Sequence, residues 1–446
     1  MPHVRPWLPI VLILFTALAV RLLAAAWWES RLPPGKKFFF GDSESYWDLA
    51  SDIAHGREYA YGDSRMFRTP GYPAVLAPLF LILGDDPPVF LARSWNALWG
   101  TAAVAAAIGL GWQLFSYKVG LITGAIAAIY PEAIGASVFV LSEAAFCPLM
   151  LGQLLLAISA SRSSSPKSRW SLAFAAGLVG GCATLVRPSW LLFTPFLLVS
   201  TCAVFSDRKK MLLLNSLQIA GLCLAMLPWW VRNYAVSGHF VATSTEVGVS
   251  LLDGWNPDAD GSSNWNVRAI RFHEVIRLIT STTRSTTGNL DIHEVDGIPI
   301  IDTTEIAQDR DARNQAINWA SENPRRVLEL GVIKLSRMWN IWPNENEFRS
   351  WPMRLVVAAT YLPLLVLIFL GLRRWGRQWT CWLLFSPAVY FTLLHMIFVS
   401  SIRYRLPPLL PLMAIAAAVI AVWLGEKLAS DDTTPKLAFA TQKPKP

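Results

Sequence analysis

The sequence predicts an all-α integral membrane protein with about ten transmembrane helices and with both termini in the cytoplasm. Of its 446 residues, 53% are hydrophobic and only 16% are charged, whereas about a quarter of an average soluble domain is charged. Several apolar runs approach or reach the roughly 20 residues that cross a bilayer. The net charge of +8 is then explained by the basic loops of a membrane protein, and it does not indicate nucleic-acid binding.

The apolar runs give the expected spans in chain order. They lie at residues 7–28, 88–113, 119–134, 138–160, 171–186, 189–205, 211–231, 351–371, 379–398 and 406–425. With this count the basic loops 162–169, 208–210 and 373–377 all face the cytoplasm, as the positive-inside rule requires. The apolar segment 70–84 is short and contains prolines, so we expect it to be interfacial or re-entrant.

This topology divides the chain into a transmembrane domain, residues 1–425, and a disordered cytoplasmic tail, residues 426–446. Two large loops, 29–87 and 232–350, lie on the outer side. The first bears amphipathic helices. Arg21 falls inside the first span, where snorkelling or an ion pair explains it as well as a function does.

The first outer loop contains the acidic stretch "GDSESYWDLASDIAHG". Apolar residues recur in it with helical spacing, at Tyr46, Leu49, Ala50, Ile53 and Ala54. We therefore expect a surface helix over Ser43–His55 that ends at Gly56. Asp42 would then be its N-cap, with Asp48 and Asp52 on the solvated face.

Arginines occur in short outer connections that normally lack them. They are Arg187, Arg232, Arg403 and Arg405, with Arg65 and Arg68 in the first outer loop. Each could snorkel or pair with a loop carboxylate, but the set indicates a bound anion, and the arginine fork suits phosphate. Glu143, near the outer end of the fourth span, could hold one of these arginines in place.

The order of several short motifs resembles that of the GT-C glycosyltransferases. An arginine and leucine lie near the end of span one, then "GDSESYWDLA", "RTPGYP", "LSE", "PWWVRN" followed by "GHFVATST", and "RYRLPPLLP". The resemblance covers roughly residues 7–425. It is to the bacterial relatives of protein O-mannosyltransferases and of the lipid A aminoarabinose transferase.

The resemblance implies an inverting hexosyl or pentosyl transferase (EC 2.4) whose donor is a sugar on a polyprenyl phosphate. It implies Asp42 as the catalytic base and Arg68, Arg403 and Arg405 as contacts of the lipid phosphate. Glu143, Arg187, Tyr72 and Tyr404 are further candidates for binding the donor phosphate or sugar. Loop 29–87 would be catalytic and loop 232–350 would lie on the acceptor side.

The acceptor is expected to be a lipid, a glycan or a protein. The protein O-mannosyltransferases carry an adjacent Asp-Glu pair in the first loop, whereas Ser43 separates Asp42 from Glu44 here. This difference weakens the case for a protein acceptor and leaves the role of Glu44 open. No cofactor is predicted, and no ligand cluster supports a divalent metal, although some relatives bind one.

We expect a bacterial plasma membrane with the active site on the periplasmic or extracellular face, because the outer loops contain no Asn-x-Ser/Thr sequon. Two alternatives remain open. A multi-span transporter would place ionisable residues near the bilayer midplane, whereas the notable charges here lie in loops at one face. A lipid-linked glycan ligase or polymerase also has large outer loops with arginines, but the aspartate and "RTPGYP" of the first loop argue against it.

Overall fold

The computed structural model describes residues 7–204, 208–263, 300–344, 348–426 and 428. Within these residues the secondary structure is helical, and the only β pairing is an isolated bridge between Tyr61 and Ser64. The predicted all-α class is therefore confirmed for this part of the chain.

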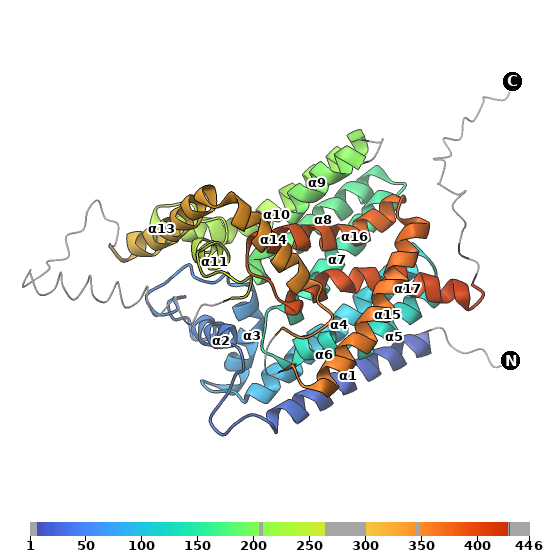
Figure 1. Ribbon diagram of the computed structural model, residues 1–446, viewed down its shortest axis with the longest axis horizontal. Coiled ribbons are helices and arrows are strands. Elements are labelled where there is room, and N and C mark those ends of the chain that lie inside the picture. The colour runs from blue at the N-terminus through green and yellow to red at the C-terminus, as the bar shows by residue number, and fades with distance from the viewer. Residues whose placement is uncertain (1–6, 205–207, 264–299, 345–347, 427, 429–446) are drawn as a thin grey trace, which may run out of the picture.

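The helices of the apolar bundle follow the predicted spans closely (Figure 1). They are α1 (Trp7–Glu29), α4 (Val89–Leu114), α5 (Tyr117–Ile129), α6 (Pro131–Val138), α7 (Glu143–Arg162), α8 (Pro166–Val186), α9 (Phe193–Val204), α10 (Arg208–Ser237), α15 (Trp351–Trp375), α16 (Trp379–Ile397) and α17 (Leu406–Trp423). The remaining helices are α2 (Gly41–Ala54), α3 (Gly71–Leu83), α11 (Val247–Gly254), α13 (Ile300–Glu322) and α14 (Pro324–Met338), with the 3₁₀ turns η1 (Pro188–Trp190) and η3 (Ile402–Arg405).

In the part of the chain that the structure describes, eight helices are long and apolar enough to cross a membrane, and nine if α5 and α6 form one bent span. The expected span 119–134 corresponds to two helices, because Pro131 breaks it and α5 and α6 meet at an angle of 55°. The span expected from residue 138 accordingly begins at Glu143. Segment 70–84 forms the 13-residue helix α3, too short to cross a bilayer.

The break at Pro131 explains the arginine inside the first span. Proline has no N–H, so the carbonyl of Ala127 loses its normal helical donor. The Arg21 side chain donates hydrogen bonds to Ala127 O at 3.2 Å and to Ala128 O at 3.0 Å, and it is 1% exposed. The expectation of snorkelling or an ion pair is therefore wrong, since Arg21 caps the C-terminus of α5.

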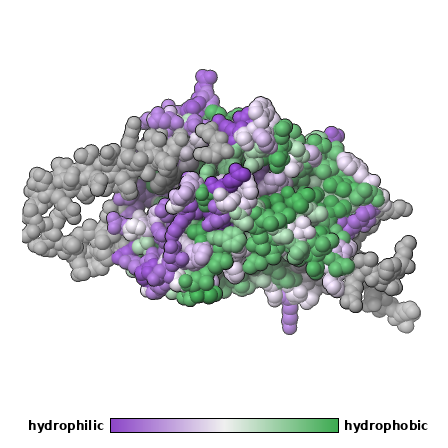
Figure 2. Space-filling view, turned by 90° about the horizontal axis from the view of Figure 1, so that it is seen from below, coloured by the Kyte–Doolittle hydropathy of each residue, from purple (hydrophilic) through white to green (hydrophobic). Residues whose placement is uncertain are grey.

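The helix α17 lies at the centre of the bundle, packed against α4, α5, α15 and α16, and nearly all of its residues are buried. The peripheral helices α1 and α15 instead expose large apolar side chains, among them Phe15 and Leu355. Figure 2 shows the result: a continuous hydrophobic surface over the bundle and hydrophilic residues gathered at the other end of the molecule. This surface suits contact with lipid.

Small residues bring α8 and α10 together. A Cβ atom on Gly177 would lie 2.0 Å from the carbonyl oxygen of Gln218, and one on Gly221 would lie 2.3 Å from that of Phe174. The two backbones can approach this closely only because both positions are glycine, which is a common way for membrane helices to pack.

The helices outside the bundle gather at one end of it. Figure 1 shows α2, α3, α11 and α13 at this end, and α1 begins and α17 ends at the opposite end. We call the end that holds α2, α3, α11 and α13 the loop end. The chain returns to it after α1, α5, α8, α10 and α16, so segments far apart in sequence meet there.

Candidate functional site

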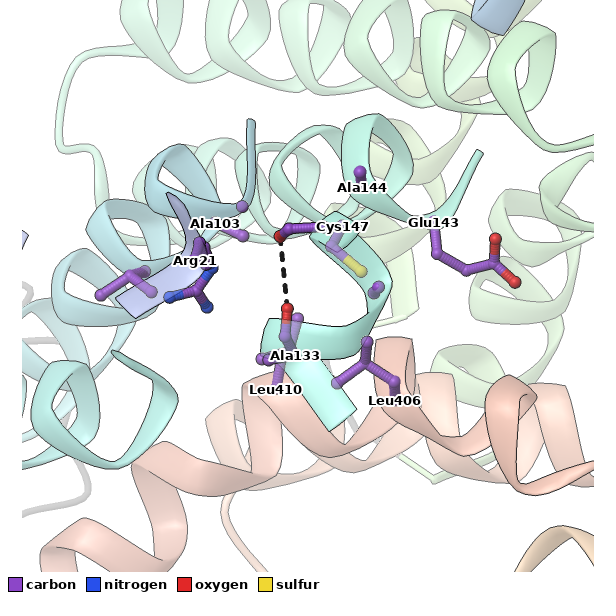
Figure 3. A pocket seen from close by; sticks show the side chains of 12 residues that line it. Arg21, Ala103, Ala133, Glu143, Ala144, Cys147, Leu406 and Leu410 are labelled. Carbon is purple, nitrogen blue, oxygen red and sulfur yellow. Dashed lines mark hydrogen bonds between the residues drawn. The ribbon is translucent and has the colours of Figure 1, made fainter. Parts of the chain in front are cut away.

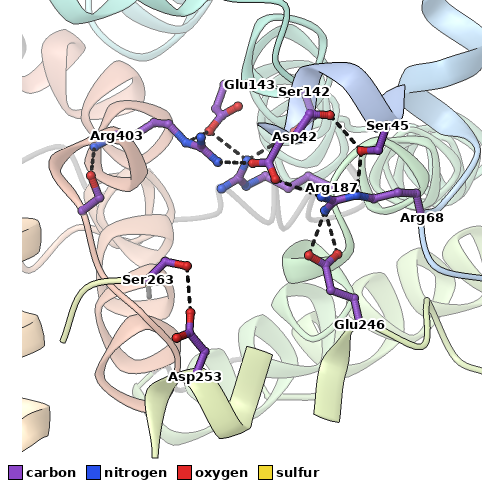
Figure 4. A network of polar contacts seen from close by, with 11 residues as sticks. Asp42, Ser45, Arg68, Ser142, Glu143, Arg187, Glu246, Asp253, Ser263 and Arg403 are labelled. Carbon is purple, nitrogen blue, oxygen red and sulfur yellow. Dashed lines mark hydrogen bonds and ion pairs between the residues drawn. The ribbon is translucent and has the colours of Figure 1, made fainter. Parts of the chain in front are cut away.

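Six charged side chains from distant parts of the chain meet at the loop end, and Figure 4 shows them together. We call them the arginine–carboxylate network: Asp42, Arg68, Glu143, Arg187, Glu246 and Arg403. Three arginines face three carboxylates, so their formal charges balance.

Asp42 lies in the first turn of α2, where the positive end of the helix dipole favours a carboxylate. One carboxylate oxygen accepts from Arg68 at 2.9 Å and the other from Arg403 at 3.1 Å. The expected N-cap role is wrong, because Phe40 occupies the N-cap and no side chain caps this helix. The Asp42 side chain is 35% exposed, so solvent reaches it.

Arg68 connects this aspartate to the second large loop. Its Nη1 donates to both carboxylate oxygens of Glu246, at 2.9 and 2.7 Å, and its Nε donates to the hydroxyl of Ser45 at 3.3 Å. The guanidinium also lies over the rings of Tyr46 and Phe67. Because all three guanidinium nitrogens have partners and two aromatic rings lie against the group, Arg68 is held in one orientation.

Glu143 begins α7 and is almost fully buried. It forms ion pairs with Arg403 at 2.8 Å and with Arg187 at 3.0 Å. Arg187 stands where Pro188 ends α8, and it also donates to the hydroxyl of Ser142 at 3.3 Å. Glu143 therefore holds two of the outer-loop arginines, as its place in the sequence suggested for one of them.

The Tyr404 ring lies beside both of these arginines. The guanidinium carbons of Arg187 and Arg403 lie 5.3 and 5.2 Å from its centroid. The imidazole of His395 is stacked on the same ring, with the two ring centroids 4.3 Å apart. The aromatic ring thus fixes the arginine pair from one side.

The electrostatic environment shifts the pKa values of the two carboxyls bound to Arg68 in opposite directions. Burial disfavours ionisation of Asp42, but the charges and hydrogen bonds of Arg68 and Arg403 outweigh it and lower the pKa of the Asp42 carboxyl. At Glu246 burial dominates, and it raises the pKa of this carboxyl despite Arg68. Asp42 is thus ionised at neutral pH, and Glu246 is the carboxylate of this pair that takes up a proton more easily.

Two predicted site residues lie elsewhere. Arg405 is fully buried, pairs with Glu132 and the carbonyl of Asn340, and stacks on Tyr361. The hydroxyl of Tyr72 is buried and exchanges hydrogen bonds with Asn96. Neither side chain joins the network. The structure instead brings together Asp42, Arg68, Glu143, Arg187, Arg403 and Tyr404 from the sequence-based set.

Two other outer arginines brace the loop that carries Arg68. Arg232 donates to the backbone carbonyls of Arg65 at 2.8 Å and Tyr59 at 3.1 Å. Arg65 pairs with Glu58 at 2.6 Å. Arg65 therefore pairs with a loop carboxylate, which was the alternative to an anion contact, whereas Arg232 binds backbone carbonyls.

Sequence reasoning missed Glu246 entirely. This residue follows "ATST" in a loop whose small polar residues suggest no function. Its position as the first acidic residue after the "GHFVATST" motif was the available signal. Only its contact with Arg68, 178 positions away, assigns it to the site.

A small cavity lies behind Glu143, between α1, α4, α6, α7 and α17 (Figure 3). It is lined by Arg21, Cys147, Leu406 and Leu410 among others. Among the described residues, no group of three or more His, Cys, Asp or Glu side chains is placed to hold a metal ion.

Comparisons with known proteins give a fold and no sequence relative. No protein-family model matches the chain, and no curated protein matches its sequence. The apo oligosaccharyltransferase of Archaeoglobus fulgidus matches in structure with a TM-score of 0.60 and 14% identity, over 95% of this chain and 51% of that chain. The AglB oligosaccharyltransferase of the same organism, in complex with an inhibitory peptide and a dolichol phosphate, matches with a TM-score of 0.55 and 14% identity, over 92% of this chain and 50% of that one.

A weaker likeness is to ArnT from Cupriavidus metallidurans bound to undecaprenyl phosphate, with a TM-score of 0.44 and 14% identity, over 93% of this chain and 78% of that one. This chain spans about half the length of the oligosaccharyltransferase structures that it matches. The chain therefore shares its fold with these oligosaccharyltransferase structures, an all-helical architecture of the kind expected from the sequence.

Proposed function

We propose that the protein transfers a hexosyl or pentosyl group from a polyprenyl phosphate to a lipid, glycan or protein acceptor. The observation that carries the proposal is the partly exposed Asp42 carboxylate held between Arg68 and Arg403. A carboxylate beside two cations can act as a general base while the cations hold a leaving phosphate. The dolichol phosphate in the AglB structure of the same fold supports a polyprenyl phosphate as donor.

Donor binding must change the network, because its six charges already balance. A phosphate that takes hydrogen bonds from Arg68 and Arg403 competes with the carboxylates that now hold them. Glu246 pairs with Arg68 and is 21% exposed, whereas Glu143 is buried between two arginines. Glu246 is therefore the carboxylate that gives way to the phosphate on Arg68, by moving or by taking up a proton.

The same exchange prepares the base. In the free protein two arginines lower the pKa of Asp42 and make it a weak base. A phosphate bound to Arg68 and Arg403 adds negative charge and withdraws their hydrogen bonds, and both effects raise the basicity of Asp42. The base thus becomes effective when the donor is in place.

In the proposed reaction the acceptor oxygen attacks the anomeric carbon from the side opposite the phosphate, which inverts that centre. The bond between the anomeric carbon and the phosphate oxygen breaks, and its electron pair leaves with the polyprenyl phosphate. Asp42 takes the proton of an acceptor hydroxyl. If the acceptor is itself a phosphate, Asp42 need only orient it.

We also propose the cellular setting and the division of labour. The protein crosses a bacterial plasma membrane several times, and the loop end faces the periplasm or the outside. Loop 29–87 is catalytic and loop 232–350 contacts the acceptor. The basic loops on the opposite side and the apolar belt of Figure 2 support this orientation.

The experiment that tests the proposal is mass spectrometry of envelope glycolipids and glycoproteins from cells with and without the gene, and from cells with the Asp42→Asn variant. We expect one glycosylated product to disappear in both mutant strains. A product that persists in the Asp42→Asn strain would overturn the catalytic assignment. A gene-dependent change in solute uptake with no change in any glycoconjugate would favour a transporter.

A further inference from the structure

Two carboxylates on α13 hold the segments that carry Arg68 and Glu246. Glu305 and Asp309 are one helical turn apart, so both face the same side of α13. Both are largely buried, although α13 as a whole is polar. Each accepts hydrogen bonds from backbone N–H groups of another segment.

Glu305 binds the segment that precedes Arg68. Its carboxylate accepts from the backbone N–H of Arg65 at 3.0 Å and of Met66 at 3.1 Å, and also from the hydroxyl of Thr245. Met66 O in turn accepts from the N–H of Thr245 at 3.0 Å. One carboxylate therefore joins the residues just before Arg68 to the residue just before Glu246.

Asp309 binds the first turn of the helix that Glu246 precedes. It accepts from the backbone N–H of Gly248 at 2.5 Å and pairs with Arg313 on its own helix. A Cβ on Gly248 would lie 1.9 Å from the Asp309 carbonyl oxygen, so α11 and α13 are in direct backbone contact. The N-terminal amides of a helix are its natural anion site, and Asp309 fills it.

These contacts matter because the segment carrying Arg68 lies between α2 and α3 and has no helix or sheet of its own to bond its amides. Backbone groups that stay unpaired in a buried position are costly. The carbonyl groups of this segment have side-chain donors: Arg232 donates to the carbonyl of Arg65, and the Tyr59 hydroxyl donates to that of Arg68. The N–H groups of Arg65 and Met66 instead donate to Glu305, on a helix 240 positions from Arg65.

We propose that Glu305 and Asp309 act as a carboxylate clamp by which α13 positions Arg68 against Glu246 and Asp42, and so sets the affinity of the site for the donor phosphate. They are positioning residues, because neither touches the network itself. This inference rests on the proposed function for the identity of the ligand. Since coupling between sites is reciprocal, phosphate bound at Arg68 must in turn stabilise the contacts of α13.

The test uses the full-length protein in lipid nanodiscs and a polyprenyl phosphate as the probe. Hydrogen–deuterium exchange is measured over residues 57–70, 245–254 and 305–322, with and without the probe, and the dissociation constant is measured for each variant. In wild-type protein we expect the probe to slow exchange in all three segments. In Glu305→Gln one side-chain oxygen is replaced by an NH₂ group that opposes the backbone donors, so we expect roughly tenfold weaker binding and faster exchange over 57–70.

Two variants separate positioning from stability. Asp309→Asn removes only the α11 half of the clamp and should weaken binding less than Glu305→Gln does. Glu322→Gln changes an exposed residue at the other end of the same helix and should bind like wild type. A positioning role predicts that Glu305→Gln loses the protection of residues 305–322 by the probe, even at temperatures well below its unfolding midpoint.

The outcomes distinguish the clamp from the proposed function. Wild-type affinity in a folded Glu305→Gln variant would overturn the clamp and leave the proposed function standing. If wild-type protein itself fails to bind the polyprenyl phosphate, the proposed function and the phosphate role of the clamp both fall. Exchange over 57–70 that is unchanged by Glu305→Gln would refute the restraint of this segment by α13 whatever the ligand is.

Discussion

Replacing Asp42 by asparagine should stop transfer without preventing the donor from binding. The two side chains are nearly the same size, so the packing of α2 is preserved. Asparagine can still accept from Arg68, but its NH₂ group then faces Arg403, now 3.1 Å from the second carboxylate oxygen. The network would keep three arginines and two carboxylates, with one positive charge in excess.

The substitution should lower the transfer rate and strengthen the binding of the donor phosphate. A positioned general base contributes roughly 10²- to 10⁴-fold to a rate, so the transfer rate should fall by about that factor, or about 3–5 kcal/mol in the barrier. One excess positive charge at an effective dielectric constant near 20 favours an anion about 6 Å away by about 3 kcal/mol. Because Asp42 is 35% exposed, solvent screening reduces this gain to about 1 kcal/mol.

Two measurements on the same purified protein check this reasoning. The first is the rate of sugar transfer from the donor identified by mass spectrometry, and the second is the dissociation constant for a polyprenyl phosphate. The matched control is Asp48→Asn, which removes an exposed carboxylate from the same helix and should leave both quantities unchanged. A variant that keeps a transfer rate within tenfold of wild type, or that binds polyprenyl phosphate many times more weakly while remaining folded, would refute the assignment of Asp42.

Three further predictions concern Glu246, the buried Lys334 and the α8–α10 contact. Glu246→Gln should tighten polyprenyl phosphate binding several-fold. Because the pKa of Glu246 is raised, mild acid should also tighten binding to the wild-type protein, relative to this variant. Parallel pH profiles of binding for the two proteins would contradict the exchange of carboxylate for phosphate. Burial lowers the pKa of Lys334 to about 8, so the folded state binds this proton less well than the unfolded state does. The free energy of unfolding should therefore rise by about 3 kcal/mol between pH 8 and the ordinary lysine pKa of 10.5. Thermal unfolding should show this rise in the wild-type protein and not in Lys334→Met. Gly177→Ala should lower the free energy of unfolding by about 1–3 kcal/mol or prevent folding, because its Cβ would meet a backbone carbonyl. The control is Gly152→Ala, whose added Cβ would lie 3.7 Å from its nearest neighbour. This variant should unfold at the wild-type temperature.

Local patterns in the sequence were sufficient for most of the architecture. Hydropathy located the helices of the bundle apart from the break between α5 and α6, because a helix that crosses a membrane must be apolar along most of its length. The amphipathic spacing around Tyr46 and Leu49 located α2. The helix ends just before Gly56, whose φ of 62° is the left-handed conformation that a glycine after a helix commonly adopts. The break within 119–134 was not predicted, because hydropathy does not register the missing N–H of Pro131.

The site was predictable only in part, for a definite reason. Asp42 was singled out by the resemblance. Unexpected charge near the outer face singled out Arg68, Glu143 and Arg403, since ionisable groups near a membrane are costly and therefore informative. The same signal selected Arg405, which the fold buries against Glu132. An arginine that pairs within the core and an arginine that faces a ligand look alike in sequence, because the difference lies in the partner.

The sequence by itself determined the class of the protein, the order of its helices and the end of the bundle at which its unexpected charges gather, because each of these follows from composition and spacing over a few turns. Only the tertiary structure decided which cations and carboxylates pair. Arg68 with Glu246 spans 178 positions and Arg403 with Asp42 spans 361. Such pairs depend on which loops the packed helices bring within 3 Å of one another, and no local pattern encodes that distance.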